Sequence, residues 1–165
     1  MSFSESAWKI FNQSINEYHQ KDDVDTPINN SFEKNTLEWL LYAKNWIDTV
    51  QWHLEDIIRD ENIEPLEALK IKRRIDSSNQ QRTDLVEFID SWFLQKYENI
   101  TPEPDAKINS ETPAWAVDRL SILALKVYHM SLEANRSSAT EEHRFNCTIK
   151  LNVLLEQKKD LSEAI

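Results

Sequence analysis

Apolar side chains recur every three or four positions along five segments of the chain, which is the spacing of one face of an α-helix. The first segment begins at Ser2, where Glu5 stands three residues later as in a capping box, and it ends before Pro27. The second segment begins near Asn35 and extends to about Asp60. The pattern therefore predicts two amphipathic helices in the N-terminal part of the chain.

The middle of the chain predicts one long helix and then an extended connection. The helix begins at Pro65, since proline is favoured at the first helical position, and it continues to about Tyr97. At about 1.5 Å per residue it is roughly 50 Å long, so we expect a kink or break around Ser77 and Ser78. The connection 98–111 is long for a bundle, and we expect it to cross one end of the bundle or to cover a pocket.

Two more helices are predicted after this connection. Thr112 and Pro113 form a strong helix start, and the segment 114–135 is apolar around most of its circumference, which is typical of a central helix. Ser138 and Glu141 form a capping box before the last helix. The pattern as a whole predicts an all-α, single-domain helical bundle of four to five helices, with a central, mostly apolar fourth helix.

The composition agrees with this prediction and excludes some chemistry. A chain of 165 residues suits one domain, and its 16 aromatic residues argue against disorder. The chain contains no glycine. Tight hairpins depend on glycine, and so do the loops that cradle phosphates in Walker and Rossmann motifs. The sequence therefore favours helices and excludes the commonest nucleotide-binding loops.

The charge and the cysteine content bear on partners and compartment. A net charge of −10 repels the phosphates of nucleic acids and of anionic lipids, so we expect neither as a partner. The first residues lack the apolar core of a signal peptide, and the longest apolar stretch is too short to span a bilayer. Cys147 is the single cysteine, which fits a reducing compartment. We therefore expect a cytoplasmic protein.

Asn79 and Arg82 interrupt the apolar stripe of the long third helix, which includes Ile75 and Val86. A buried arginine needs a carboxylate, a ligand or solvent. One interpretation is a structural arginine in an ion pair across helices, or a kink that turns this segment outward. The other is an arginine that binds an anionic group, with Asn79 as an orienting donor.

The second predicted helix carries a polar arc opposite its apolar face. Such arcs are most often solvated. Trp52 lies at the centre of this one, however, and a large aromatic side chain is usually buried. His53 and Asp56 are three residues apart and could share a proton or a metal ion, although this spacing is weak evidence. The arc consists of Asn45, Asp48, Thr49, Trp52, His53, Asp56, Arg59 and Asp60.

Asp118 and His129 are polar positions on the fourth predicted helix. They lie on one side of it but about 16 Å apart along the axis, so they cannot touch. Asp118 is in a position to pair with Arg82, while His129 faces another level of the bundle. The alternative is that each residue is satisfied separately and has no role in function.

Known metal-site motifs are absent. Helical di-iron proteins use two Glu-x-x-His motifs, of which the chain has none, and paired-cysteine zinc sites are excluded by a single cysteine. The acids Asp84, Glu87 and Asp90 have the spacing of helical Mg²⁺ sites but lie off the apolar stripe. We therefore assign no metal ligands from the sequence. Cys147 and His143 are one turn apart, which occurs easily by chance.

Three segments carry a family resemblance. They are NWIDTVQWHLED at 45–56, KRRID and NQQRTDLVE at 72–76 and 79–87, and PAWAVDRLSILALKVYHM at 113–130. Together they resemble a bacterial family of domains of unknown function, number 4254. The resemblance covers about residues 37–161, the family core, and leaves 1–36 as an N-terminal helix and linker. It implies a bacterial, intracellular helical protein and no assigned activity.

Two functional hypotheses of different classes follow from these features. In the first, the second, third and fourth helices form a polar cleft that binds a small anionic or phosphorylated ligand. The candidate ligand-binding residues are Asn79, Arg82, Trp52 and His129, and the candidate catalytic residues are His53, Asp56 and Asp118. In the second, the protein is a non-catalytic interaction module that forms a homo-oligomer or binds another protein through Trp52. Neither a reaction nor a cofactor follows from the sequence.

Overall fold

The computed structural model describes residues 2–165, which form five helices and no strand. The helices are α1 (Phe3–Tyr18), α2 (Leu37–Ile58), α3 (Pro65–Lys96), α4 (Pro113–Asn135) and α5 (Glu141–Ala164). The prediction of an all-α bundle is therefore confirmed. None of the helices has the length and apolar character needed to cross a membrane.

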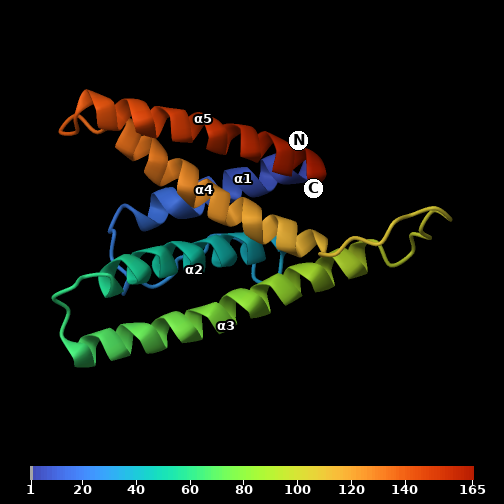
Figure 1. Ribbon diagram of the computed structural model, residues 1–165. Coiled ribbons are helices and arrows are strands. Elements are labelled where there is room, and N and C mark those ends of the chain that lie inside the picture. The colour runs from blue at the N-terminus through green and yellow to red at the C-terminus, as the bar shows by residue number, and fades with distance from the viewer. Residues whose placement is uncertain (1) are drawn as a thin grey trace.

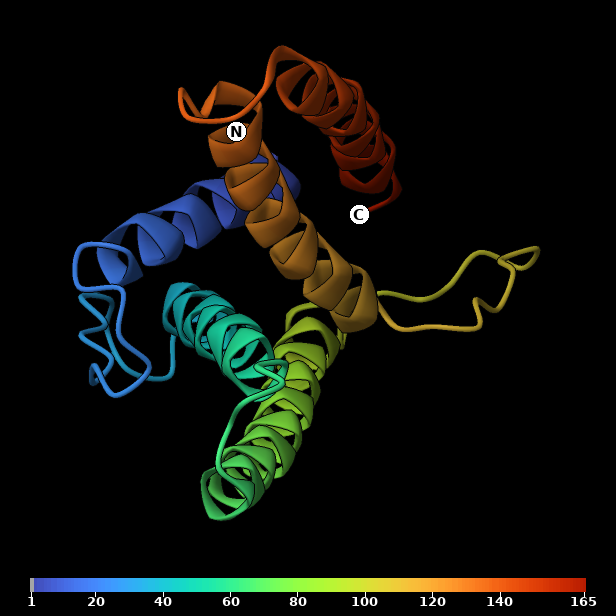
Figure 2. The same cartoon turned by 60° about the vertical axis from the view of Figure 1, so that its left-hand side comes forward.

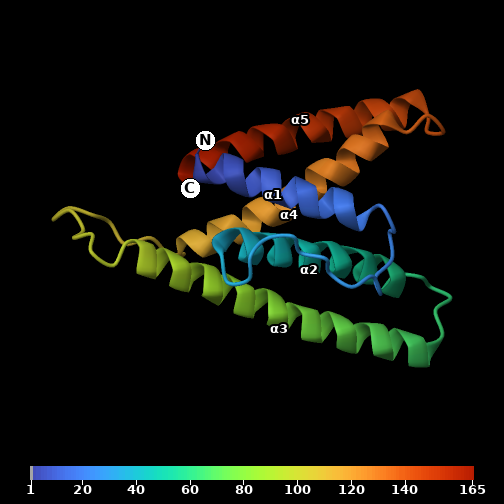
Figure 3. The same ribbon diagram turned by 180° about the vertical axis from the view of Figure 1, so that it is seen from behind.

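The helices are arranged around α4. Figure 1 shows α2 and α3 lying side by side, α4 crossing them obliquely, and α5 folding back along the far side of α4. The view from behind shows α1 between α2 and α5 (Figure 3). Of the five helices, α4 alone contacts all four others, which confirms its predicted central position. The connection 97–112 projects away from the bundle, so our expectation that it covers a pocket or crosses the end of the bundle is wrong.

Local side-chain hydrogen bonds explain where the first two helices begin. Ser2 and Glu5 form the predicted capping box, since each side chain is bonded to the other's backbone N–H. The side chain of Thr36 caps α2 by accepting a hydrogen bond from Trp39 N at 3.2 Å. The predicted cap, Asn35, instead has a positive φ of 69°, a conformation that asparagine tolerates.

The later helices depart more from the predicted starts. The cap of α5 is Thr140, two residues after the predicted Ser138, and its side chain accepts a hydrogen bond from His143 N. Thr112 and Pro113 begin α4 as predicted, but the side chain that caps α4 comes from α3. There the Asp90 carboxylate accepts hydrogen bonds from Thr112 Oγ1 at 2.7 Å and from Ala114 N at 3.3 Å.

The long helix α3 is continuous through Ser77 and Ser78, so the predicted break is wrong. Sharp kinks usually need proline, a glycine–serine pair or an inserted group, and serine alone does not impose one. Ser78 is buried in the helix, on the side that also carries Ile71 and Ile75. The small side chain therefore occupies a core position without interrupting the helix.

The main core lies between α1, α2, α3 and the first half of α4. Its largest fully buried apolar side chains are Phe11, Ile15, Tyr18, Leu41, Tyr42, Ile89, Val117, Leu120 and Leu125. Leu54 lies in a second, smaller cluster with Ile71 and Ile75. The second half of α4 is only partly buried, and Cys147 is the single buried residue of α5. As a result α5 presents exposed apolar side chains, and the groove between α4 and α5 is less filled than the core.

Candidate functional site

The residues selected from the sequence fall into two groups at different levels of the bundle. We define the ion-pair network as Lys44, Asp48, Arg82, Asp118 and Ser121. We define the histidine cluster as His19, His53 and His129. Trp52 lies beside both, since it borders a cleft next to Arg82 and stacks on His129 with the ring centroids 4.9 Å apart.

The ion-pair network is centred on Asp48, whose side chain is fully buried. The Lys44 ammonium, also fully buried, donates to the two carboxylate oxygens at 2.7 and 2.6 Å and lies 2.6 Å from Asp118 Oδ1. Arg82 Nε donates to Asp48 at 2.6 Å. Ser121 Oγ donates to the other oxygen, also at 2.6 Å. The network therefore joins α2, α3 and α4 through one carboxylate.

The charges of this network balance, with two cations against two carboxylates. Burying charge is tolerated only when partners compensate the lost hydration, and here each charged group has at least one partner within 4 Å. The Arg82 guanidinium lies 3.7 Å from Asp118, so the two residues are close enough to pair, as the sequence analysis anticipated. Asn79 is exposed and accepts hydrogen bonds from Gln51 and Arg82.

A small cleft lies between α2, α3 and α4. Its volume is about 170 Å³, and the ligand-binding candidates that line it are Arg82 and Trp52. His53 and His129 instead join the histidine cluster, and Asp56 is on the surface with its carboxylate bonded to Arg59. The residues of the first functional hypothesis therefore do not share one site: Arg82 and Trp52 line the cleft, His53 and His129 belong to the histidine cluster, and Asp56 is on the surface.

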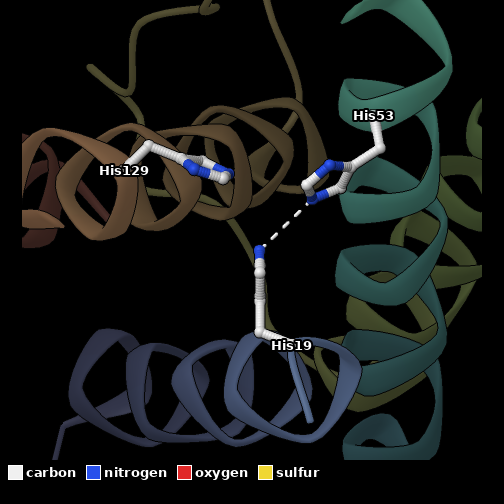
Figure 4. A group of neighbouring side chains, drawn as sticks. All are labelled: His19, His53 and His129. Carbon is white, nitrogen blue, oxygen red and sulfur yellow. Dashed lines mark hydrogen bonds between the residues drawn. The ribbon is translucent and has the colours of Figure 1, made fainter. Parts of the chain in front are cut away.

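The histidine cluster brings together three helices (Figure 4). His19 follows the last residue of α1, His53 lies near the end of α2, and His129 lies in the second half of α4. One ring nitrogen of each histidine lies within 4.8 Å of the other two. The Nε2 atoms of His19 and His53 are 3.2 Å apart, and Figure 4 shows the three rings directed toward a common centre.

Hydrogen bonds define which nitrogens are free to act as ligands. His19 Nδ1 lies 2.7 Å from the Ile15 carbonyl, which can only accept, so Nδ1 carries the proton. The Nε2 lone pair of His19 consequently points into the cluster, 3.2 Å from His53 Nε2. His129 Nε2 is buried and has no hydrogen-bond partner in residues 2–165. A buried ring nitrogen without a hydrogen-bond partner, close to two other imidazoles, has a lone pair that a cation could bind.

Aromatic neighbours stack on His53 and His129, and burial keeps these two rings neutral. His53 stacks on Tyr18, and His129 lies nearly parallel to Trp52 at an interplanar angle of 7°. Burial, together with the rings of His19 and His53, lowers the pKa of His129 to about 4. Burial also lowers the pKa of His53. Both rings are therefore uncharged at neutral pH, which is the form that binds metal ions.

Asp22 adds a carboxylate at the edge of the cluster. Its Oδ1 lies 3.6 Å from His53 Nε2 and 3.9 Å from His19 Nε2. The backbone of Asp22 has a positive φ of 52°, and its N–H donates to the Tyr18 carbonyl at 3.0 Å. This conformation costs a non-glycine residue about 1 kcal/mol, and aspartate is among the residues that tolerate it best. The turn thus directs a carboxylate toward the histidines at some backbone cost.

The distances are compatible with a single bound transition-metal ion. Ligand nitrogens of a tetrahedral zinc site are about 3.3 Å apart, given zinc–nitrogen bonds of about 2.0–2.1 Å. The His19–His53 distance already has this value, and His129 would move inward by roughly 1 Å or more, given that zinc geometry. Asp22 is close enough to supply a fourth, oxygen ligand. Three imidazoles and one carboxylate suit zinc and its neighbours in the first transition row.

Sequence reasoning missed His19, Asp22 and Lys44. His19 and Asp22 follow the apolar stripe of α1, and no spacing rule links position 19 to positions 53 and 129. Lys44 lies inside the apolar run of α2, where a lysine is expected to reach solvent. One signal was present: of the four histidines in the chain, His53 and His129 had each been singled out as misplaced polar residues.

The metal-free protein should lose stability as the pH falls from 7 to 5. The pKa of His129 is about 4 in the folded state and about 6.5 when unfolded, so the unfolded chain takes up the proton first. The lowered pKa of His53 destabilises the folded state in the same pH range. The nearby carboxylates of Asp22 and Asp56 raise the pKa of both histidines and so reduce the effect. We expect a loss of about 1 kcal/mol, roughly half of the ~1.8 kcal/mol that these two pKa values imply between pH 7 and 5, because the ring of His129 is partly solvated.

Urea denaturation of the metal-free protein at a series of pH values measures this loss. The variant His129→Gln should flatten the pH dependence, whereas His143→Gln, at a half-exposed histidine of α5, should leave it as in the wild type. An equal slope for the wild type and His129→Gln would show that this ring does not cause the effect.

Comparison with known proteins gives one match. A family model described as "Protein of unknown function (DUF4254)" matches residues 38–165. No curated protein and no solved structure matches the chain significantly. The matched range includes the whole ion-pair network together with His53 and His129, whereas His19 and Asp22 precede it.

Proposed function

We propose a metal-binding function for this chain, which belongs to the DUF4254 family of proteins of unknown function. The ligands in this proposal are the three imidazoles of His19, His53 and His129, and the ion is a divalent transition metal such as Zn²⁺. The observation that carries it is the convergence of three ring nitrogens within 4.8 Å, one of which is buried without a partner.

Three features of the cluster support this proposal over a purely structural role. The rings come from three different helices, so a bound ion would crosslink the bundle. Two of the rings have lowered pKa values and so need no deprotonation at neutral pH. The Ile15 carbonyl fixes the tautomer of His19, as outer partners do for metal-bound histidines in general. A packed structural histidine would more commonly have both of its ring nitrogens satisfied.

The fourth coordination position decides what such a centre could do. Asp22 as the fourth ligand would close the site and make it structural or sensory. Water in that position would make the ion a Lewis acid that lowers the pKa of the bound water. Asp22 and Asp56 give the surroundings negative charge, which favours cations and disfavours phosphate-like substrates here.

Titration of the metal-free protein with Co²⁺ and Zn²⁺ tests the proposal. We expect one equivalent of Co²⁺ to bind with the intense visible absorption of a four-coordinate site, and Zn²⁺ to displace it. His53→Asn should weaken binding by at least about 100-fold, since it removes one of three imidazoles. His143→Asn is the matched control, because His143 is a partly exposed helical histidine bonded to Glu133. Equal loss in both variants, or binding without saturation, would contradict the proposal.

The hypothesis of an anionic ligand at Arg82 is a weaker proposal for the cleft between α2, α3 and α4. The Arg82 guanidinium already faces Asp48, Asp118 and Asn79, so an anion would compete with carboxylates for it. The cytoplasm stays our expected compartment, because Cys147 is a buried free thiol. Self-association through Trp52 also stays a prediction, although the stacking of Trp52 on His129 provides the cover that its aromatic ring requires.

A further inference from the structure

Helices α4 and α5 diverge from the loop that joins them (Figure 1), and two cavities occupy the groove between them. The cavity nearer the loop has a volume of about 540 Å³ and is lined chiefly by apolar side chains, including Trp52, Met130, Val153 and Leu154. The other has a volume of about 580 Å³. Each volume is in the range of small-molecule sites, which is about 300–1,000 Å³.

The two cavities differ in polarity, and Lys126 lines both of them. Beyond Lys126, the second cavity is bordered by charged and amide side chains, among them Arg119, Gln157 and Asp160. The groove is therefore almost entirely apolar at one end and mixed at the other, where Ile122 and Leu123 also line the wall, and the exposed Lys126 lies at the junction. Such a gradient fits an amphiphile whose tail lies in the first cavity and whose head group lies at Lys126.

The charges around the apolar cavity favour an anionic head group. Lys126 and Lys150 both line it, and within residues 2–165 no carboxylate lies within 4.0 Å of either ammonium group. Glu133, the acidic residue of the lining, is engaged by Arg136 and His143. The mouth of this cavity is thus locally positive in a chain of net charge −10. Local positive charge attracts and orients an anionic ligand.

We propose that the groove between α4 and α5 binds a fatty carboxylate, with its acyl chain against Trp52, Met130 and Val153 and its carboxylate at Lys126. Met130 and the lysine stems give the wall the adaptability that a flexible acyl chain requires. Binding would not need the metal centre, although His129 belongs to the wall of the same cavity. The two sites would therefore be neighbours that share His129.

Dodecanoate is the probe, used below its micelle concentration with metal-free protein, and the quenching of Trp fluorescence together with calorimetry measures binding. We expect one saturable site in the micromolar range. Lys126→Glu should weaken dodecanoate about tenfold and leave the neutral dodecanol unchanged, because only the head-group contact is lost. Val153→Asp should abolish the binding of both; Val153 is half exposed, so the fold should tolerate the change. Lys107→Glu, in the exposed connection, is the control.

Three results would overturn the proposal: no saturable binding, equal loss of affinity for dodecanoate and dodecanol in Lys126→Glu, or a dimer that Val153→Asp dissociates. The last result, read by light scattering, would identify a second copy as the occupant of the groove. Metal binding is measured separately on the same variants. A failure of either site is then distinguishable, since Lys126→Glu and Val153→Asp leave all three histidines in place.

Discussion

Replacing Asp48 with alanine should lower the free energy of unfolding by about 3–5 kcal/mol, the cost typical of leaving a buried charge without its partner. Asp48 is the carboxylate that both Lys44 and Arg82 contact, and Lys44 is fully buried. Without it, the two cations Lys44 and Arg82 share the single carboxylate of Asp118, so one buried positive charge is uncompensated, and Ser121 loses the acceptor of its hydroxyl. The loss is a large fraction of the stability of a domain of this size.

Urea denaturation at pH 7, followed by circular dichroism, measures this change. Asp76→Ala is the matched control, because Asp76 is an exposed helical aspartate paired with Lys72 and should cost less than about 1 kcal/mol. A loss below 1 kcal/mol for Asp48→Ala would mean that Lys44 finds solvent or another acceptor. If Asp48→Ala does not fold, Ser121→Ala provides the second measurement. We expect a loss of about 1–3 kcal/mol, because the Ser121 hydroxyl donates to Asp48 and accepts from Asn45.

Saturation with Zn²⁺ should raise the free energy of unfolding by about 2.7 kcal/mol when the free ion is a hundredfold above its dissociation constant. The reason is mass action: the unfolded chain has no preformed arrangement of His19, His53 and His129, so the ion binds mainly to the folded state. The bound ion would also give the buried Nε2 of His129 a partner, which it otherwise lacks. A chelator should reverse the gain.

Paired denaturation curves with and without Zn²⁺ measure this gain. His53→Asn should abolish it, while His143→Asn should retain it in full, because His143 contacts Glu133 and Cys147 and lies outside the cluster. A gain that persists in His53→Asn would indicate binding elsewhere on the acidic surface. The stabilisation reports on folding and needs no assumption about a catalysed reaction.

The helices and their order could be predicted from the sequence because the information is local. Periodicity places each helix to within a few residues, and Ser2 and Pro113 mark their starts correctly. The differences have local causes as well. Asn35 and Thr36 are adjacent, and either side chain can cap the N-terminus of α2. Ser138 and Thr140 are likewise both suitable as the N-cap of α5. The cap that Asp90 provides to α4 could not be foreseen, since it depends on how α3 and α4 meet.

The residues of the candidate site could be predicted only where a polar residue interrupts the apolar stripe of a predicted helix. Arg82 and Asp118 were visible in this way, and the structure brings them to 3.7 Å from each other. Lys44 was not visible, because a lysine within an apolar run is expected to extend to solvent, and only the fold shows that two carboxylates enclose it. His19 was not visible because the turn after α1 decides which helices it faces.

A hydrogen bond between Ser4 and Ser162 connects the first helix to the last. The hydroxyl of Ser4 donates to the Ser162 carbonyl at 3.1 Å, so the first and last helices meet at the same end of the bundle (Figures 1 and 3). Figure 2 shows the connection between α3 and α4 projecting away from the other helices. Each helix contacts the next one along the chain, and α5 also contacts α1. Loops join the four consecutive pairs, whereas α5 and α1 are joined by non-covalent contacts alone. A circular permutant opened in the projecting segment 98–111, with the two meeting helices joined by a short linker, would keep every helix contact. It would make the contacts between α1 and α5 local but those between α3 and α4 the most distant in sequence. Because α3 and α4 contact each other more extensively than α1 and α5 do, we expect the permutant to fold more slowly.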